Sequence, residues 1–186
     1  TIDPDFAVRA IESRAERVRI EANLRHSTLE QHFNESALAG LGSSADYPFK
    51  RELRTLWEFA KQLELARGKP DTGTRVDYNF YVENDRVRIV PRPRGSPIDK
   101  LVAELMIFVN TEWGRRLAET DLAGIYRTQT NSRTAMSVQP APHEGLGVKQ
   151  YAWSSSPLRR YIDLVNQRQL LALLQGTPAP YQRDEQ

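Results

Sequence analysis

The chain has 186 residues, 39% of them hydrophobic and 27% charged, which is the composition of an ordinary globular domain large enough to bury a core. The absence of cysteine excludes a disulfide-linked partner and thiolate metal sites, and no apolar run is long enough to cross a membrane. The net charge of +2 is too small to predict nucleic-acid binding by itself. We expect a cytoplasmic protein. Because the chain opens on Thr1 instead of Met, we also expect a fragment.

The first segment, residues 1–21, begins with two acidic residues around a proline, Asp3-Pro4-Asp5. This pattern is typical of a turn. Two carboxylates are too few for a pair of divalent metal ions, which need several hard oxygen ligands, so we assign them no metal site. The alternation Val18-Arg19-Ile20 predicts a strand at the edge of a sheet.

A short helix is predicted next. Ser27 and Glu30 have the spacing of a capping box, and an apolar stripe follows at helical intervals. The stripe consists of Leu29, Phe33 and Ala37. His26 and His32 lack a metal-ligand pattern, and we interpret them as surface or cap residues. Residues 40–46, rich in Gly and Ser, predict a connection.

The following pattern predicts a longer helix over Tyr47–Arg67, ended by Gly68. Its apolar face is made of Leu53, Leu56, Trp57, Ala60 and Leu63. Four basic residues mark the other face, and we interpret them as a solvated surface. They are Lys50, Arg51, Arg54 and Lys61.

Residues Val76–Val90 predict a β-hairpin. A two-residue turn at Asn84-Asp85 would set Glu83 opposite Arg86. One face of the first strand carries Val76, Tyr78, Phe80 and Val82, and the arginines near the other face are Arg86, Arg88, Arg92 and Arg94. Arginines beside aromatic rings can bind single-stranded nucleic acid, but an amphipathic surface hairpin accounts for the same residues. Both interpretations stay open.

A second long helix is predicted to begin at Ser96-Pro97 and to run to Ala118. It is apolar almost all round from Leu101 to Val109, which is typical of a buried helix. Glu104 is the one charge in that run, so burial would require a cation or several donors for it. Either a salt bridge that fixes helix packing or an active-site organiser would satisfy this requirement.

After a short predicted strand at Gly124–Gln129, residues 131–147 have the composition of an exposed irregular loop, and His143 stands in it without chemical partners. The last helix is predicted to begin at Ser156, as N-cap, with Pro157 in the first turn. A Pro-containing tail from Gly176 is expected to be frayed.

The stretch YAWSSSPLRRYIDL, Tyr151 to Leu164, suggests an anion site, because two arginines would stand beside the unpaired N–H groups of a helix start. A capped amphipathic helix with two surface arginines is the other interpretation. The stretch resembles the block Y-x-x-(T/S)-S-P-I-R-R-Y-x-D-L of the ribonuclease II (RNB) family of exoribonucleases. Three further blocks occur in the family's order. They are Asn23-Leu24-Arg25-His26, the segment from Glu52 to Lys69, and Leu101 to Ile107 with Asn110.

This resemblance implies a processive 3′→5′ exoribonuclease that hydrolyses single-stranded RNA with Mg²⁺ and releases nucleoside 5′-monophosphates. It also implies the site residues. Arg159 matches the arginine that contacts the scissile phosphate, and Glu104 matches a glutamate near the active centre. The remaining matches, which we expect to bind substrate or support the site, are Ser156, Arg160, Tyr161 and Tyr151. We expect Asp163 to hold Arg159 through an i,i+4 contact, and Arg159 to lie near Glu104.

Two departures from the family pattern matter. Gln167 stands where many relatives have His, and the aspartate cluster that binds Mg²⁺ in the family would lie upstream of Thr1. We therefore expect residues 1–176 to be the C-terminal part of an RNB catalytic domain, residues 177–186 to be a polar tail, and the fragment to be inactive alone. The alternatives are a non-catalytic RNA-binding or regulatory protein with a degenerate RNB domain, and a helical interaction module. The expected fold is α+β, with three substantial helices around a small, mainly antiparallel sheet.

Overall fold

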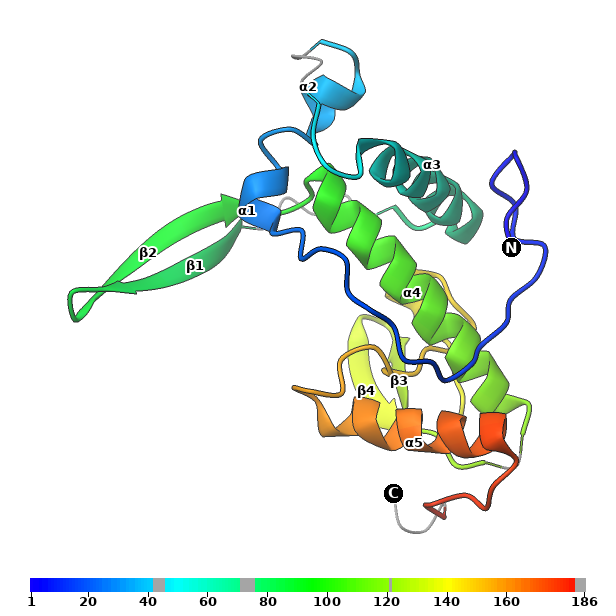
Figure 1. Ribbon diagram of the computed structural model, residues 1–186. Helices are drawn as coiled ribbons and strands as arrows, with labels where there is room; N and C mark the ends of the chain where they lie inside the picture. The colour runs from blue at the N-terminus through cyan, green and yellow to red at the C-terminus, as the bar shows by residue number, and fades with distance from the viewer. Residues whose placement is uncertain (42–45, 71–75, 121, 183–186) are drawn as a thin grey trace.

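The computed structural model describes residues 1–41, 46–70, 76–120 and 122–182. Two long helices, α3 (Lys50–Arg67) and α4 (Pro97–Ala118), pack against each other, and α5 (Tyr161–Gln175) lies near the C-terminal end of α4 (Figure 1). Two separate antiparallel hairpins complete the fold. The predicted α+β class with three substantial helices is confirmed, and within the described residues it contains two two-stranded sheets.

The core between α3 and α4 explains why the long helices form where the pattern predicts them. Leu53 and Ala60 of α3 are buried against Ile98 and Leu101 of α4, as apolar stripes at helical spacing require. Gly68, in the left-handed conformation at φ +66°, ends α3 as predicted. The helix begins at Lys50, three residues later than predicted.

The segment before α3 differs from the single helix that we predicted. It forms two one-turn helices, α1 (His26–Leu29) and α2 (Glu35–Leu38). Asn34 interrupts them, because its side chain accepts from the Ala37 N–H at 3.0 Å and caps α2. The predicted capping box at Ser27 and Glu30 is wrong, because α1 begins at His26, one residue before Ser27. The predicted connection at 40–46 lies largely outside the described residues.

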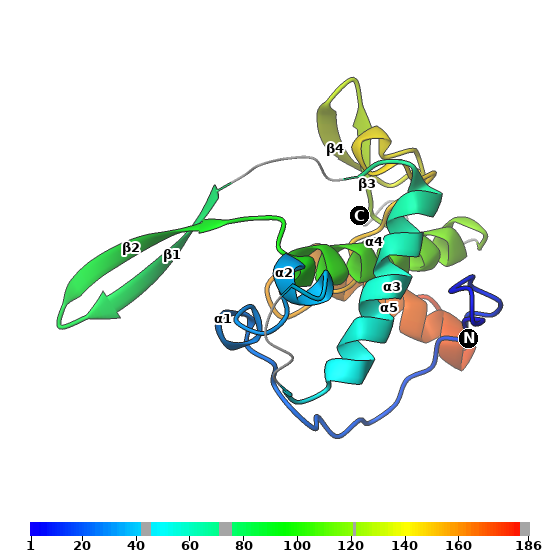
Figure 2. The same ribbon diagram turned by 90° about the horizontal axis from the view of Figure 1, so that it is seen from above.

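The first hairpin pairs β1 (Val76–Glu83) with β2 (Arg86–Pro93), and it projects from the helical body (Figures 1 and 2). Asn84 and Asp85 both have positive φ, as a tight two-residue turn requires, and Glu83 lies opposite Arg86 as predicted. The Glu83 carboxylate pairs with Arg88, at 3.0 Å.

A second hairpin occupies part of the predicted loop 131–147. It pairs β3 (Tyr126–Thr130) with β4 (Arg133–Ser137), and a short 3₁₀ helix, η1 (Glu144–Leu146), follows. Asn131 and Ser132 make the turn, both with positive φ. The loop prediction was therefore wrong for β4 and η1, while the predicted strand at Gly124–Gln129 is confirmed as β3.

Residues at the two ends also correct the predictions. Val18–Ile20 is not in a strand, and the segment before α1 is an extended arm that crosses the C-terminal part of α4 and continues to α1 (Figure 1). The turn at Asp3-Pro4-Asp5 is confirmed: the Asp3 carboxylate accepts from the N–H groups of Asp5 and Ala7. The tail is fixed as far as Tyr181, whose carbonyl accepts from Gln169 at 3.0 Å. No helix in the described part of the chain is long and apolar enough to cross a membrane.

Candidate functional site

The loop Tyr151–Arg160 lies between α4 and α5, and α4 fixes its first half. Asn110, fully buried on α4, accepts from the Ser154 N–H at 3.0 Å. Its amide nitrogen lies 3.2 Å from both the Tyr151 hydroxyl and the Ser155 hydroxyl. One amide side chain thus determines the path of the loop over its first turn.

The α5 helix holds the same loop from the other side. The buried Asn166 donates to the carbonyls of Trp153 and Ile125, each at 2.8 Å, and accepts from the Ile125 N–H. Gln167 donates to the Ser154 carbonyl at 2.7 Å. Although Gln167 departs from the family pattern, its amide still has a defined task in the loop.

The second half of the loop does not begin a helix at Ser156. Instead, the Ser156 carbonyl accepts from the N–H groups of Arg159 and Arg160, which closes a turn, and α5 begins at Tyr161. The reason is Asp163, which reaches back from the first turn of α5 to accept from the Ser156 N–H at 2.7 Å. The prediction that Ser156 is the helix N-cap is therefore wrong.

Asp163 also determines which of the two neighbouring arginines, Arg159 or Arg160, forms an ion pair with the protein. It is fully buried and accepts from Nε and Nη2 of Arg160, at 2.7 and 2.8 Å, in a bidentate pair. The Arg160 guanidinium also lies over the Trp153 ring, 4.3 Å from its centroid, and Arg127 lies 4.5 Å from the same centroid. The predicted contact between Asp163 and Arg159 is wrong, because Arg160 occupies the carboxylate.

Arg159 is consequently the outward-facing member of the doublet. Its side chain is exposed, and its guanidinium makes one contact, a long one of 3.4 Å to the Ser156 hydroxyl. Leu158 is fully exposed, and Tyr161 is 71% exposed. The rigid loop therefore presents one guanidinium and one phenol to solvent, which suits an anionic ligand.

Glu104 lies on α4 and is buried. Its carboxylate forms a buried bidentate ion pair with Arg67 at the end of α3, and both side chains are at most 7% exposed. Arg67 also donates to the Leu146 carbonyl at 2.8 Å, so the pair joins α3, α4 and η1. The predicted need for a cation is confirmed, and that cation is Arg67; among the described residues no hydrogen bond or ion pair joins Glu104 to Arg159.

Tyr151 and His143 lie beneath the loop. Burial raises the pKa of the Tyr151 phenol, and the hydrogen bond from Asn110 opposes that rise. His143, predicted to be isolated, is buried, and its ring packs edge-on against Tyr151 with centroids 5.8 Å apart. Burial, and then the positive charge of Arg127, lower the pKa of His143. Sequence reasoning missed this support, because the loop composition of 131–147 gave no sign of burial.

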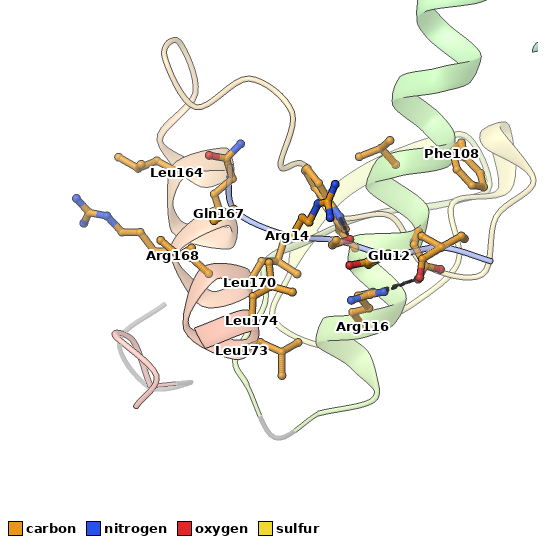
Figure 3. Close-up of a pocket in the computed structure, with 17 residues that line it drawn as sticks. Glu12, Arg14, Phe108, Arg116, Leu164, Gln167, Arg168, Leu170, Leu173 and Leu174 are labelled. Atoms are coloured by element: carbon orange, nitrogen blue, oxygen red, sulfur yellow. Dashed lines mark hydrogen bonds and ion pairs between the residues drawn. The ribbon is translucent and has the colours of Figure 1, made fainter. Parts of the chain in front are cut away.

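The apolar faces of α4 and α5 form a pocket of about 620 Å³ that the arm at residues 11–15 partly covers (Figure 3). Arg116 donates to the Ile11 carbonyl and Trp113 to the Ser13 hydroxyl, each at 3.2 Å, and these bonds hold the arm. Arg159 is not among the lining residues, so this pocket is separate from the arginine loop.

Known proteins share part of this sequence and its fold. Residues 129–176, which include the whole arginine loop, match the RNB domain. This match shows that a segment of the chain is similar to the RNB domain. Among curated relatives, "Exoribonuclease 2" of Edwardsiella piscicida is 52% identical over 44 residues, which are 24% of this chain and 7% of the relative. The protein of the same name from Cronobacter sakazakii is 46% identical over 50 residues, which are 27% and 8%.

Solved structures show a similar fold. An active-site mutant of the Dss1 exoribonuclease from Candida glabrata matches with a TM-score of 0.64 and 19% identity over 81% of this chain and 26% of that one. Mycoplasma genitalium RNase R in complex with ribose-methylated single-stranded RNA matches with a TM-score of 0.58 and 16% identity, over 83% and 33%. This chain therefore spans about a third or less of these structures and less than a tenth of the curated relatives cited above.

A site for two divalent ions would need several hard oxygen ligands close together. The one cluster of His and carboxylate groups close enough to share an ion, among the residues described, is His26, Glu30 and Asp99. The guanidinium of Arg92 already lies there, 2.5 Å from both Asp99 Oδ1 and His26 Nε2. A fixed cation in that position repels a metal ion.

Proposed function

We propose that residues 1–176 are part of the catalytic domain of a cytoplasmic, hydrolytic 3′→5′ exoribonuclease that degrades single-stranded RNA to nucleoside 5′-monophosphates. The observation that carries the proposal is the exposed Arg159 on a loop that both helices fix. The names of the relatives, which are exoribonucleases, support it. We further propose that the parent enzyme uses Mg²⁺ with ligands outside the described residues, so this chain alone does not degrade RNA.

In this proposal the two neighbouring arginines have different tasks. Arg159 contacts the scissile phosphate and stabilises the negative charge that increases in the transition state, because a guanidinium can donate two parallel hydrogen bonds to phosphate oxygens. Arg160, bound to Asp163, keeps the loop in shape. Tyr161 and the Ser156 hydroxyl flank Arg159 and are proposed to contact the substrate. The direct roles first expected of Tyr151 and Glu104 remain predictions, and their burial favours support of the site.

The test uses the whole parent enzyme and a labelled single-stranded RNA. Arg159→Ala should lower kcat by about 100- to 1,000-fold, the usual effect of removing one transition-state donor, and change RNA affinity much less. Arg159→Lys should restore only part of kcat, because lysine lacks the fork geometry. Near-normal turnover of Arg159→Ala would remove Arg159 from the catalytic residues. Mg²⁺-dependent release of mononucleotides by this chain alone would refute its proposed inactivity.

A non-catalytic RNA-binding protein is the second candidate. It is favoured by the one His–carboxylate cluster found among the described residues, which holds an arginine instead of an ion. In that case the parent protein would bind single-stranded RNA through Arg159 but would not shorten it at any Mg²⁺ concentration.

A further inference from the structure

A second concave surface lies between the first hairpin and the segment that precedes α1, at the end of the molecule where the hairpin projects (Figures 1 and 2). Its volume is about 770 Å³, which is within the range of ordinary ligand sites. We call it the hairpin groove. Its lining combines polar side chains, among them Asn23, Arg25 and Asn79, with the apolar side chains of Leu24, Phe80 and Val90.

The strand register sorts the side chains of the hairpin by face. Tyr81 lies opposite Arg88, and Asn79 opposite Val90, so these side chains share the face that lines the groove. The apolar residues Tyr78 and Phe80 belong to the other face and are 57% and 67% exposed. The hairpin thus lines the groove with Asn79 and Tyr81, and Phe80, Val90 and Pro91 also contribute to the lining.

The groove has rigid walls. Arg92 donates to Asp99 at 2.5 Å and lies 2.5 Å from His26, which joins the base of the hairpin to α1 and α4. Glu30 is the one carboxylate among the lining residues, and His26 contacts it at 3.2 Å. The charges at the base are thus largely paired with one another.

The upper part of the groove has unsatisfied polar groups beside an aromatic ring. Arg25 is exposed, and neither its guanidinium nor the amides of Asn23 and Asn79 have a hydrogen-bond or ion-pair partner among the described residues. The guanidinium of Arg88 lies 4.7 Å from the centroid of the Tyr81 ring, so ring and guanidinium together form an extended stacking surface.

We propose that the hairpin groove binds a nucleotide of single-stranded RNA, apart from the phosphate at Arg159. The base packs against Tyr81 and Arg88, the two free amides face its polar edge, and Arg25 contacts the neighbouring phosphate. Stacking on an aromatic side chain with a nearby cation is how proteins bind single strands without reading their sequence. Among the lining residues two arginines, Arg25 and Arg92, stand against one carboxylate, Glu30, and this balance favours an anionic strand over a neutral protein segment. This proposal rests on the proposed function in RNA degradation.

The test measures binding of the whole 186-residue chain to a fluorescent oligoadenylate of about 16 nucleotides by anisotropy, over a range of salt concentrations. Tyr81→Ala should weaken binding by about 5- to 150-fold, and Tyr81→Phe should bind like the native chain. Arg25→Ala should weaken binding and lower the slope of log affinity against log salt by about 0.7, the value for one phosphate contact on a single strand.

Two matched controls lie on surfaces away from the groove. Tyr78→Ala removes an exposed tyrosine from the opposite face of the hairpin, and Arg133→Ala removes an exposed arginine from β4. Both variants should bind RNA with a Kd within about twofold of the native value, a difference of at most about 0.4 kcal/mol. Circular dichroism of every variant verifies that the fold is intact.

The outcomes separate this proposal from the proposed function. If Arg159→Ala weakens binding while Tyr81→Ala and Arg25→Ala do not, the hairpin groove is refuted and the arginine loop is not. If Tyr78→Ala weakens binding as much as Tyr81→Ala, the RNA uses the apolar face and the groove is refuted. If the native chain does not bind RNA at low salt, the hairpin groove is refuted, whereas the proposed function is decided by the turnover of the Arg159 variants in the parent enzyme.

Discussion

The buried ion pair between Arg67 and Glu104 gives the sharpest stability prediction. Arg67→Ala leaves the Glu104 carboxylate inside the protein without its cation, and it also removes the bond to the Leu146 carbonyl. Breaking one partner of a buried pair costs about 3–5 kcal/mol, and side chains that are 7% and 6% exposed belong to that class. This is a large part of the about 5–15 kcal/mol that stabilises a typical domain.

The measurement is urea unfolding followed by circular dichroism, on the native chain and on three variants. Arg67→Ala and Glu104→Ala should each lose about 3–5 kcal/mol of unfolding free energy, which corresponds to a decrease in Tm of about 6–20 °C. The double variant Arg67→Met with Glu104→Leu should recover most of this loss, because no uncompensated buried charge remains. The stability of the double variant therefore shows whether the loss in the single variants comes from a lone buried charge or from the missing ion pair.

The matched control is the exposed pair between Arg88 and Glu83, whose side chains are 55% and 60% exposed. Arg88→Ala should cost at most about 1 kcal/mol, because water already screens that pair. If Arg67→Ala costs no more than Arg88→Ala, the buried pair is not what joins α3 to α4. If the double variant is as unstable as the worse single one, the loss comes from the missing pair and not from a lone buried charge.

Three further predictions concern groups that support the arginine loop or the α4 helix. Asn110→Ala leaves a buried main-chain N–H without its acceptor and should lose about 1–3 kcal/mol of unfolding free energy in urea titration; a loss below 0.5 kcal/mol, roughly the effect of a surface substitution, would contradict this role. Because the pKa of His143 is lowered in the folded chain, protonation favours the unfolded chain, and the free energy of unfolding should fall as the pH drops below about 6.5. His143→Phe should remove that component of the pH profile. The hydrogen bond from Arg115 lowers the pKa of Glu112, so its contribution is present above about pH 4.5 and disappears as the pH falls through its folded-state pKa; Glu112→Gln should therefore destabilise the chain at neutral pH, and the difference from the native chain should shrink in acid.

Local patterns predicted those features that depend on neighbours in the sequence. The start of α4 is correct because the Ser96 hydroxyl accepts from the Asp99 N–H, three residues away. The same Ser-Pro pair at Ser156 does not start a helix, because the Asp163 carboxylate captures the Ser156 N–H and stabilises a turn instead. Sequence alone did not show which of the two local hydrogen-bond patterns is more stable.

Features that depend on distant contacts were predicted only as requirements. The sequence indicates that a buried Glu104 needs a cation, but its partner Arg67 lies 37 positions earlier and is selected by the way α3 packs on α4. The alternation at Val18–Ile20 suits a strand, yet residues 18–20 make no strand pairing in the structure, and Val18 and Ile20 remain 75% and 80% exposed. Alternation predicts a strand only where another strand is available to pair with it.

The enclosure of Arg160 has a consequence for how the loop responds to ions. Because the Asp163 carboxylate neutralises that guanidinium inside the protein, the doublet offers a single uncompensated charge to an approaching phosphate. Counterion release depends on the number of phosphates that a protein neutralises, so the loop should contribute about one ion to the salt dependence of RNA binding instead of two. A site of this kind discriminates through the geometry of one guanidinium and gains little from general electrostatic attraction.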